Sequence, residues 1–413
     1  MRPEPGEPTA RRRAATEPPE APEVTAVVPT IGGSPWLAAC LLALRRQEGV
    51  RSLEIMVVDQ APQPLALPPG LADRVLRPPR NLGFTGGTNL GIAAARGELL
   101  ATVNDDAVVE PGWLATLAAA LRFDPRAAAA QGVNLLADAR DLDAAYDDGP
   151  LPGALRRQAP NRRQRIDSCG LGWNRWWQAI QLGHGMALAE LDSALPAGAV
   201  PGTPAAVTAV ASAAPESARA TPDDAPIEVF GVSATAALFR RAALARVAPD
   251  GQVFDPRLIS YYEDAELAGR LRAAGFHALL APAARALHAG SASGRAAPAS
   301  RRRWRLIYGN RYLVAARLLG RGLWLRLPRM LLRDLLDLAG PFAPRRSRNR
   351  RAECEPGDIG QDAGRGAGRR LLPGVVAGWG RALRHLPEFA HRGVSAPPLA
   401  EVARLSRWPP QSG

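Results

Sequence analysis

The chain has 413 residues and a formal net charge of +13 at pH 7, with 40 glycines, 39 prolines and three cysteines. This length allows one large domain or two ordinary ones around a buried core. The cysteines are few and widely spaced, which argues against a disulfide framework or a zinc knuckle and is typical of a reducing cytoplasm. We expect neither a signal peptide nor a spanning helix, because no apolar stretch is long enough.

The positive charge is concentrated in one segment. The sequence contains no lysine, so arginine carries all of it. Between Arg295 and Arg351, sixteen arginines stand against two acidic residues, a surplus of fourteen that accounts for the whole net charge. Such an asymmetry predicts an anionic partner, namely phospholipid, a lipid diphosphate or nucleic acid.

The first half of the chain alternates short apolar runs with helical patterns. Residues 1–22 are rich in Pro, Glu and Arg and are predicted to be a disordered tail. Strands are predicted at Val24–Pro29, Leu53–Val58, Arg74–Arg77 and Leu99–Val103, and helices at Pro35–Arg46, at Thr88–Ala95 and from Pro111 onward. This alternation predicts an α/β domain with a mostly parallel central sheet flanked by helices.

The second half is interrupted by low-complexity sequence. Residues 190–222 are rich in Ala, Pro, Ser and Thr and are predicted to be an insertion in a domain that spans 23–300. A helix is expected at Glu263–Ala274 and a strand near His277–Ala281. Residues 301–340 predict basic amphipathic helices broken at Pro328, with an arginine face formed by Arg317, Arg321, Arg329 and Arg333. Residues 341–413, rich in Arg, Gly and Pro, are expected to have little order.

Two segments have the residues that a nucleotide-sugar site needs. The run Asn81–Ile92 contains glycines, which allow close backbone approach to a ligand, together with two asparagines. Asn104-Asp105-Asp106 follows an apolar strand, and carboxylates there can hold a divalent metal. Asp59 also follows a strand, so these side chains are expected at the sheet edge where ligands collect.

Five segments in the same order make the chain resemble the family 2 glycosyltransferases, which have the GT-A nucleotide-diphospho-sugar transferase fold. It is most similar to their rhamnosyltransferase and galactofuranosyltransferase branch. The segments are Val27–Thr30, Val57–Asp59, Asn81–Ile92, Asn104–Asp106 with Pro111-Gly112, and Tyr261–Glu266. The resemblance covers roughly Val24 to Tyr312 and implies the same fold.

The resemblance implies roles for the residues in these segments. Asp59 would bind the nucleobase, because a carboxylate can accept from a ring N–H; the structural alternative is a turn aspartate at a strand end. The residues expected at the donor are Thr30, Asp59, Asn81, Gly83, Gly86, Asn89, Asn104 and Asp105. For the glycine run the structural alternative is a tight turn before a helix.

A metal site and a catalytic base are also implied. Asp106 would be the main ligand of Mg²⁺ or Mn²⁺, and His288 would be a second ligand or a diphosphate contact. Asp264 would be the general base of an inverting transfer; its alternative is a helix N-terminal acid that complements the macrodipole. Glu263, Arg302 and Arg303 are possible contacts of the diphosphate or the acceptor.

The sequence therefore predicts a metal-dependent inverting glycosyltransferase that moves one sugar. The donor would be a dTDP- or UDP-sugar, such as dTDP-rhamnose, and the acceptor a polyprenyl-diphosphate-linked or polysaccharide glycan of the cell envelope. The basic helices would hold the protein at the anionic inner face of the cell membrane. The alternatives are a galactofuranose transferase, a sugar nucleotidyltransferase, and a non-enzymatic protein that binds anionic lipid or nucleic acid. The nucleic-acid alternative lacks a recognised module, so no nucleic-acid partner is expected.

Overall fold

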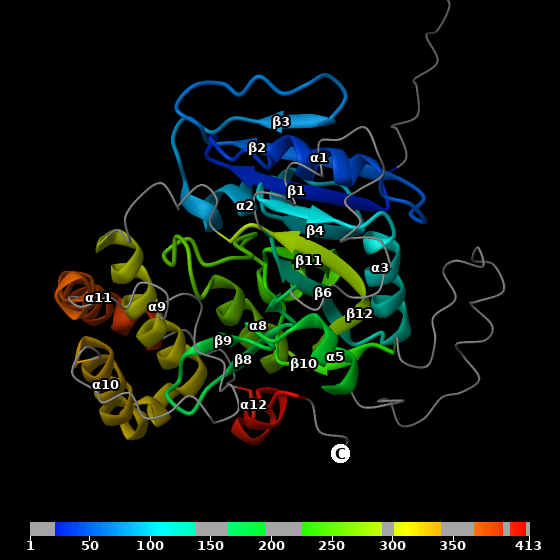
Figure 1. The fold of residues 1–413 in the computed structure, drawn as a ribbon. Coiled ribbons are helices and arrows are strands. Elements are labelled where there is room, and N and C mark those ends of the chain that lie inside the picture. The colour runs from blue at the N-terminus through cyan, green and yellow to red at the C-terminus, as the bar shows by residue number, and fades with distance from the viewer. Residues whose placement is uncertain are drawn as a thin grey trace, which may run out of the picture.

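The structure is a computed structural model that describes residues 21–137, 164–194, 225–290, 301–339, 367–390 and 397–409. The predictions for residues 1–20, for most of the 190–222 insertion and for 340–366 lie outside the described residues. One mixed sheet forms the centre of the molecule, with helices around it (Figure 1). The fold is α/β, as the sequence predicted.

The sheet has the order β10-β12-β6-β11-β4-β1-β2-β3, with β5 added to β12 and β7 added to β6. Its strands are β1 (Val24–Thr30), β2 (Leu53–Asp59), β3 (Arg74–Leu76), β4 (Leu99–Val103), β5 (Ala107–Val109), β6 (Ala127–Leu136), β7 (Ile166–Ser168), β10 (Ile227–Val229), β11 (Ala236–Arg240) and β12 (His277–His288). A separate hairpin joins β8 (Leu171–Trp173) and β9 (Ala179–Gln181).

The sheet is parallel from β3 to β4 and mixed beyond it. β11 pairs antiparallel with both β4 and β6, and β10 and β5 pair antiparallel with β12. The expected parallel pairing is therefore found among β1 to β4 and between β6 and β12, and the other pairs are antiparallel. The strands are too short and too uniformly apolar for their periodicity to reveal direction, because β1 and β4 are buried along their whole length.

The helices of the first 290 residues cover this sheet. They are α1 (Leu37–Arg45), α2 (Gly83–Ala94), α3 (Trp113–Phe123), α5 (Leu188–Ala194), α7 (Arg241–Val247) and α8 (Glu263–Ala273). Helix α2 approaches β1 closely at Gly91, where a Cβ atom would lie 2.3 Å from the Val27 side chain. The helix begins at Gly83, five residues before the predicted start, so most of the glycine run is helical.

A helical unit lies beside the sheet domain (Figure 1). It consists of α9 (Arg301–Leu319), the 3₁₀ turn η4 (Gly320–Gly322), α10 (Leu323–Ala339) and α11 (Ala367–Ala390), with α12 (Leu399–Leu405) beneath the hairpin. Helix α11 packs along α9. Among the described residues, no helix has the length and apolar character needed to cross a membrane.

Three expectations for this part of the chain are wrong. The break between the helices falls at Gly320, whose φ is +52°, and Pro328 lies inside α10. The four arginines do not share an exposed face, since Arg317 is buried against Glu266 and Asp255. Residues 367–390 and 399–405 are helical, because apolar side chains such as Val375 and Phe389 are buried despite the Arg-rich composition.

Candidate active site

The candidate site forms where β1, β2 and β4 end. In the parallel pairing of β1 with β2, Thr30 lies beside Asp59, so both reach the same edge. The Thr30 hydroxyl donates a 2.5 Å hydrogen bond to Asp105, which follows β4. Residues separated by 75 positions are thereby joined at the carboxyl ends of parallel strands, as expected for an α/β binding site.

Asp105 is a buried carboxyl group at the centre of this edge. Burial raises its pKa to about 6, against the lowering effect of the Thr30 hydrogen bond, and the neighbouring Asp106 raises it further. Its backbone carbonyl accepts from the Ser34 hydroxyl at 3.1 Å. The side-chain oxygen of Asn104 is buried next to it without a hydrogen-bond partner within the described structure. A cluster of acceptors with one orphaned oxygen favours a cationic or donor ligand.

Asp106 and His288 face each other across this cluster. His288 ends β12, and its Nε2 lies 3.3 Å from Asp106 Oδ1, while its Nδ1 donates to Asp167 at 2.8 Å. Burial disfavours charge on this imidazole, but the hydrogen bonds and charges of Asp106 and Asp167 prevail and raise its pKa to about 10. Although burial acts to raise it, the pKa of Asp167 is held well below its usual range by hydrogen bonds from His184 and His288.

These residues fit the predicted divalent metal as a partial ligand set. Within the described ranges, no three Asp, Glu, His or Cys side chains form a ready-made metal site. Asp106 and His288 supply two candidate ligands, and Asp167 would orient the imidazole through Nδ1, an arrangement common around metal-binding histidines. Such a site would leave other positions for diphosphate oxygens, which is how Mg²⁺ is usually held.

The Asp59 carboxylate makes more hydrogen bonds within the protein than its predicted nucleobase-binding role requires. Its carboxylate accepts from the amides of Ala61 and Leu65 at 2.9 and 3.0 Å and pairs with Arg77 at 2.5 Å. The aspartate thus orders the loop after β2, as the turn interpretation predicted. Arg77, which we did not single out in the sequence, pairs with this buried carboxylate and is itself partly exposed, so it would meet a ligand at the same place.

The residues of the glycine run, Asn81–Ile92, mainly bond to other parts of the protein. The amides of Leu82, Gly83 and Thr85 donate to Gln60, Asn81 and Ile259, so they are not free to cradle a ligand. The Asn89 side chain is buried and bonded to Gln252 and to both backbone groups of Phe254. Gly86 is half-buried beside Leu82. Asn81, which is exposed, is left as the side chain of this run best placed for a ligand.

Asp264 enters the site from the first turn of α8. The amides of Ala265 and Ala234 stabilise its carboxylate. Ala234 precedes Thr235, whose carbonyl accepts from the Asn104 amide at 2.8 Å, so Asp264 is connected to the acidic cluster through one short segment. The structure therefore brings the β4, β12 and α8 candidates to one end of the sheet.

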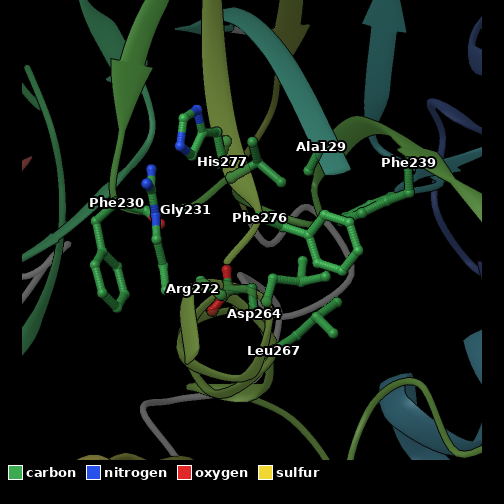
Figure 2. Close-up of a pocket in the computed structure, with 13 residues that line it drawn as sticks. Ala129, Phe230, Gly231, Phe239, Asp264, Leu267, Arg272, Phe276 and His277 are labelled. Atoms are coloured by element: carbon green, nitrogen blue, oxygen red, sulfur yellow. The ribbon is translucent and has the colours of Figure 1, made fainter. Parts of the chain in front are cut away.

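Apolar surroundings raise the pKa of both acids at the start of α8. Asp264, Leu267, Phe239 and Phe276 are among the residues that line a cavity of about 10 Å³ behind the helix (Figure 2). Burial raises the pKa of Asp264 to about 6. Burial, and then the charge of Asp264, raise the pKa of Glu263 to about 8. The cavity has room for about one water molecule and is too small for a nucleotide.

The turn before α8 is strained. Ile259, Tyr261 and Tyr262 have φ values of +66°, +68° and +70°, a region that side chains of these types rarely adopt. Asn310 of α9 holds this turn by donating to the carbonyls of Leu258, Ser260 and Tyr261 at 2.8–2.9 Å. Strain held in place by surrounding contacts is common at functional sites.

The predicted arginines lie at the start of α9. The Arg303 guanidinium is 5.9 Å from the centre of the Tyr261 ring, beside the strained turn, whereas Arg302 is exposed. Asp167, Arg77 and Asn310 are the residues of this site that the sequence did not reveal. Asp167 gave no signal in the sequence, because its partner His288 is 121 residues away.

Comparison with known protein families finds a match in the N-terminal part of the chain. Residues 25–167 match the sequence model of the family described as Glycosyl transferase family 2. The matched part of the chain contains Thr30, Asp59 and Asp106. No curated protein sequence matches the chain.

Solved glycosyltransferase structures show more distant likeness. GalNAc-T7 with UDP, GalNAc and Mn²⁺ is 15% identical, with a TM-score of 0.43 over 73% of this chain and 51% of that chain. Mannosyltransferase PcManGT from Pyrobaculum calidifontis, in complex with GDP-Man and Mn²⁺, is 16% identical, with a TM-score of 0.41 over 88% of both chains. TarS from S. aureus is 13% identical, with a TM-score of 0.36 over 72% of this chain and 43% of that chain. This chain spans about half the length of the first of these.

Proposed function

We propose that this protein is a metal-dependent inverting glycosyltransferase that moves a single sugar from a nucleotide-diphospho-sugar to an acceptor hydroxyl. One observation carries the proposal. At one end of the sheet, Asp106, which lies in the part of the chain that matches the family 2 model, is next to Asp105 and faces His288. Asp264, whose pKa is raised, is connected to this cluster through the segment Ala234-Thr235. A cluster that can hold a diphosphate through a cation, next to a carboxylate base, is suited to glycosyl transfer.

The proposed reaction is a single displacement. The acceptor oxygen forms a bond to the anomeric carbon of the sugar while its proton passes to a carboxylate oxygen of Asp264. The bond between that carbon and the diphosphate oxygen breaks, and the nucleoside diphosphate leaves. A divalent ion bound at Asp106 and His288 would neutralise charge on the leaving diphosphate. The base must be ionised for this role, and its pKa of about 6 allows that at neutral pH.

The identity of the substrates is a finer proposal that rests on the sequence resemblance alone. We favour a dTDP-rhamnose donor and a polyprenyl-diphosphate-linked or polysaccharide acceptor. A UDP-galactofuranose donor is the alternative. The loop from Ala61 to Leu65, ordered by Asp59 and Arg77, would lie at the nucleobase and determine which nucleotide fits.

A binding titration tests the proposal. We expect purified protein to bind dTDP or UDP more tightly with Mn²⁺ than with EDTA, measured by calorimetry. Asp106→Ala should remove most of the Mn²⁺-dependent gain, at least tenfold, because the main ligand is lost. Asp124→Ala is the control, since Asp124 pairs with His277 where β12 begins, at the far end of that strand from His288. Equal affinity for wild type and Asp106→Ala with Mn²⁺ would overturn the metal assignment.

A further inference from the structure

Helix α10 has the reverse of the polarity expected for a surface helix. Its outward face is apolar, with Trp324 65% exposed and Leu325 84% exposed. Its inward face has the acidic residues: Asp334 is fully buried and accepts from Arg311, from Tyr312 at 2.5 Å and from Trp379 at 2.8 Å. Hydrogen bonds thus fix the helix so that exposed leucines such as Leu325 and Leu332 point away from the protein.

Helix α11 repeats this arrangement. Leu372, Val376 and Leu383 are 49%, 52% and 75% exposed, at a spacing that places them on one face, while Val375 and Phe389 on other faces are fully buried. Trp379 of α11 donates the bond to Asp334 of α10, so the two helices are held together. Figure 1 shows both on the outer side of α9.

We call the exposed apolar side chains of these two contacting helices the α10–α11 surface. Its residues are Trp324, Leu325, Leu331, Leu332, Leu335, Leu336, Leu372, Val376 and Leu383. Elsewhere in the described structure the large exposed apolar residues are scattered, such as Val75 and Phe123. A concentration of this kind marks an interaction site rather than ordinary exposure.

The charges around this surface are positive. Arg321, Arg329 and Arg384 are exposed on or beside it, and within 301–339 neither aspartate is exposed. An apolar face with a basic border is complementary to an anionic bilayer, where leucines enter the headgroup region and arginines meet lipid phosphates. A second copy would bring the same positive border against itself.

We infer that the α10–α11 surface docks this protein on an anionic phospholipid bilayer. The helices would lie in the plane of the headgroups. Docking would also order the approach to the site, because α11 reaches the strained turn: Arg381 donates to Asn310, which holds that turn, and to the carbonyl of Arg257. The inference is independent of which donor the enzyme uses.

Co-flotation with liposomes tests this inference. Full-length protein should bind vesicles of equal phosphatidylcholine and phosphatidylglycerol in low salt, and bind pure phosphatidylcholine at least tenfold less. The double variant Leu325→Glu and Leu332→Glu should lose at least tenfold of the binding to the mixed vesicles. The matched control is Val75→Glu with Phe123→Glu, which adds the same charge at exposed apolar positions away from the surface and should bind as wild type does.

Two further readouts make the result decisive. Circular dichroism and dTDP or UDP binding should be unchanged in both double variants, which separates lost docking from misfolding and from failure of the proposed function. Wild type that fails to float with the mixed vesicles would overturn the inference. A Leu325→Glu and Leu332→Glu variant that floats like wild type would also overturn it. The inference would fail as well if light scattering showed a dimer for wild type and a monomer for this variant, and neither protein bound vesicles.

Discussion

Asp264 is the residue on which the proposed chemistry depends. It is placed by the α8 helix start, by the amides of Ala265 and Ala234, and by apolar neighbours that raise its pKa to about 6. Glu263 beside it has a pKa of about 8 and is therefore mostly protonated at neutral pH. Two adjacent acids with separated pKa values can take different roles, with Asp264 as the ionised base and Glu263 as a neutral neighbour.

A pH profile follows from this assignment. The base is active when ionised, so we expect kcat/KM to rise about tenfold per pH unit below pH 6 and to level off above about pH 7. Initial rates with a saturating acceptor between pH 5 and 8 would measure it. A flat profile between pH 5 and 7 would contradict Asp264 as the base.

The same pKa values act on stability in the opposite direction. A carboxyl group whose pKa is raised on folding stabilises the protein while it is protonated, and that contribution is lost as pH rises through the folded-state value. For Asp105 and Asp264 this loss runs from the ordinary value of 3.8 up to about pH 6, and for Glu263 from 4.5 up to about pH 8. The conditions that ionise the base therefore weaken the fold around it.

At the scale of elements, the sequence predicted local structure well and pairing poorly. The strand at Leu99–Val103 was predicted at its observed bounds, and those beginning at Val24 and Leu53 to within one residue, since buried strands show as short apolar runs. The direction of β11 could not be predicted, because it depends on contacts with β4 and β6 more than 100 residues away. Helix α11 was missed because its apolar positions are separated by Arg, Gly and Pro.

The candidate site likewise contains residues that the sequence predicted and residues that it could not reveal. Asp106 and His288 were predicted as neighbours because a family resemblance supplied their pairing, and the structure places them 3.3 Å apart. Asp167 and Asn310 have no local signal, since each acts on a partner far away in sequence. Asn89 is conspicuous in the sequence as a polar residue in the glycine run, but its role is to bind the loop at Gln252–Phe254.

The start of α2 offers a test at this scale. Gly83 has φ of +75°, and an added Cβ would lie 2.8 Å from the Ile259 side chain. We expect Gly83→Ala to cost about 1–3 kcal/mol of unfolding free energy and to weaken donor binding, because it pushes on the strained turn. Gly112→Ala is the control: Gly112 has negative φ and nothing within 4 Å of the added atom. Denaturant unfolding measures both; equal stability of the two variants would contradict the argument.

The whole molecule combines a sheet domain that holds the candidate site with a helical unit that contacts the turn before Asp264. The two are joined by buried ion pairs, among them Arg317 with Asp255 and Glu266, and by Asn310. Removing one partner of such a pair leaves a buried charge and costs about 3–5 kcal/mol. The helical unit is therefore part of the fold of the site as well as the proposed docking surface.

The central claim is that this chain transfers sugar from a nucleotide donor with Asp264 as base. The most direct measurement is release of nucleoside diphosphate from a panel of dTDP-, UDP- and GDP-sugars with Mn²⁺, for wild type and Asp264→Asn. We predict turnover of at least one donor by wild type, a loss of at least about 100-fold in Asp264→Asn, and unchanged nucleotide affinity in that variant. An Asp264→Asn protein that turns over donor at the wild-type rate, or a folded wild type that binds none of the donors, would contradict the account.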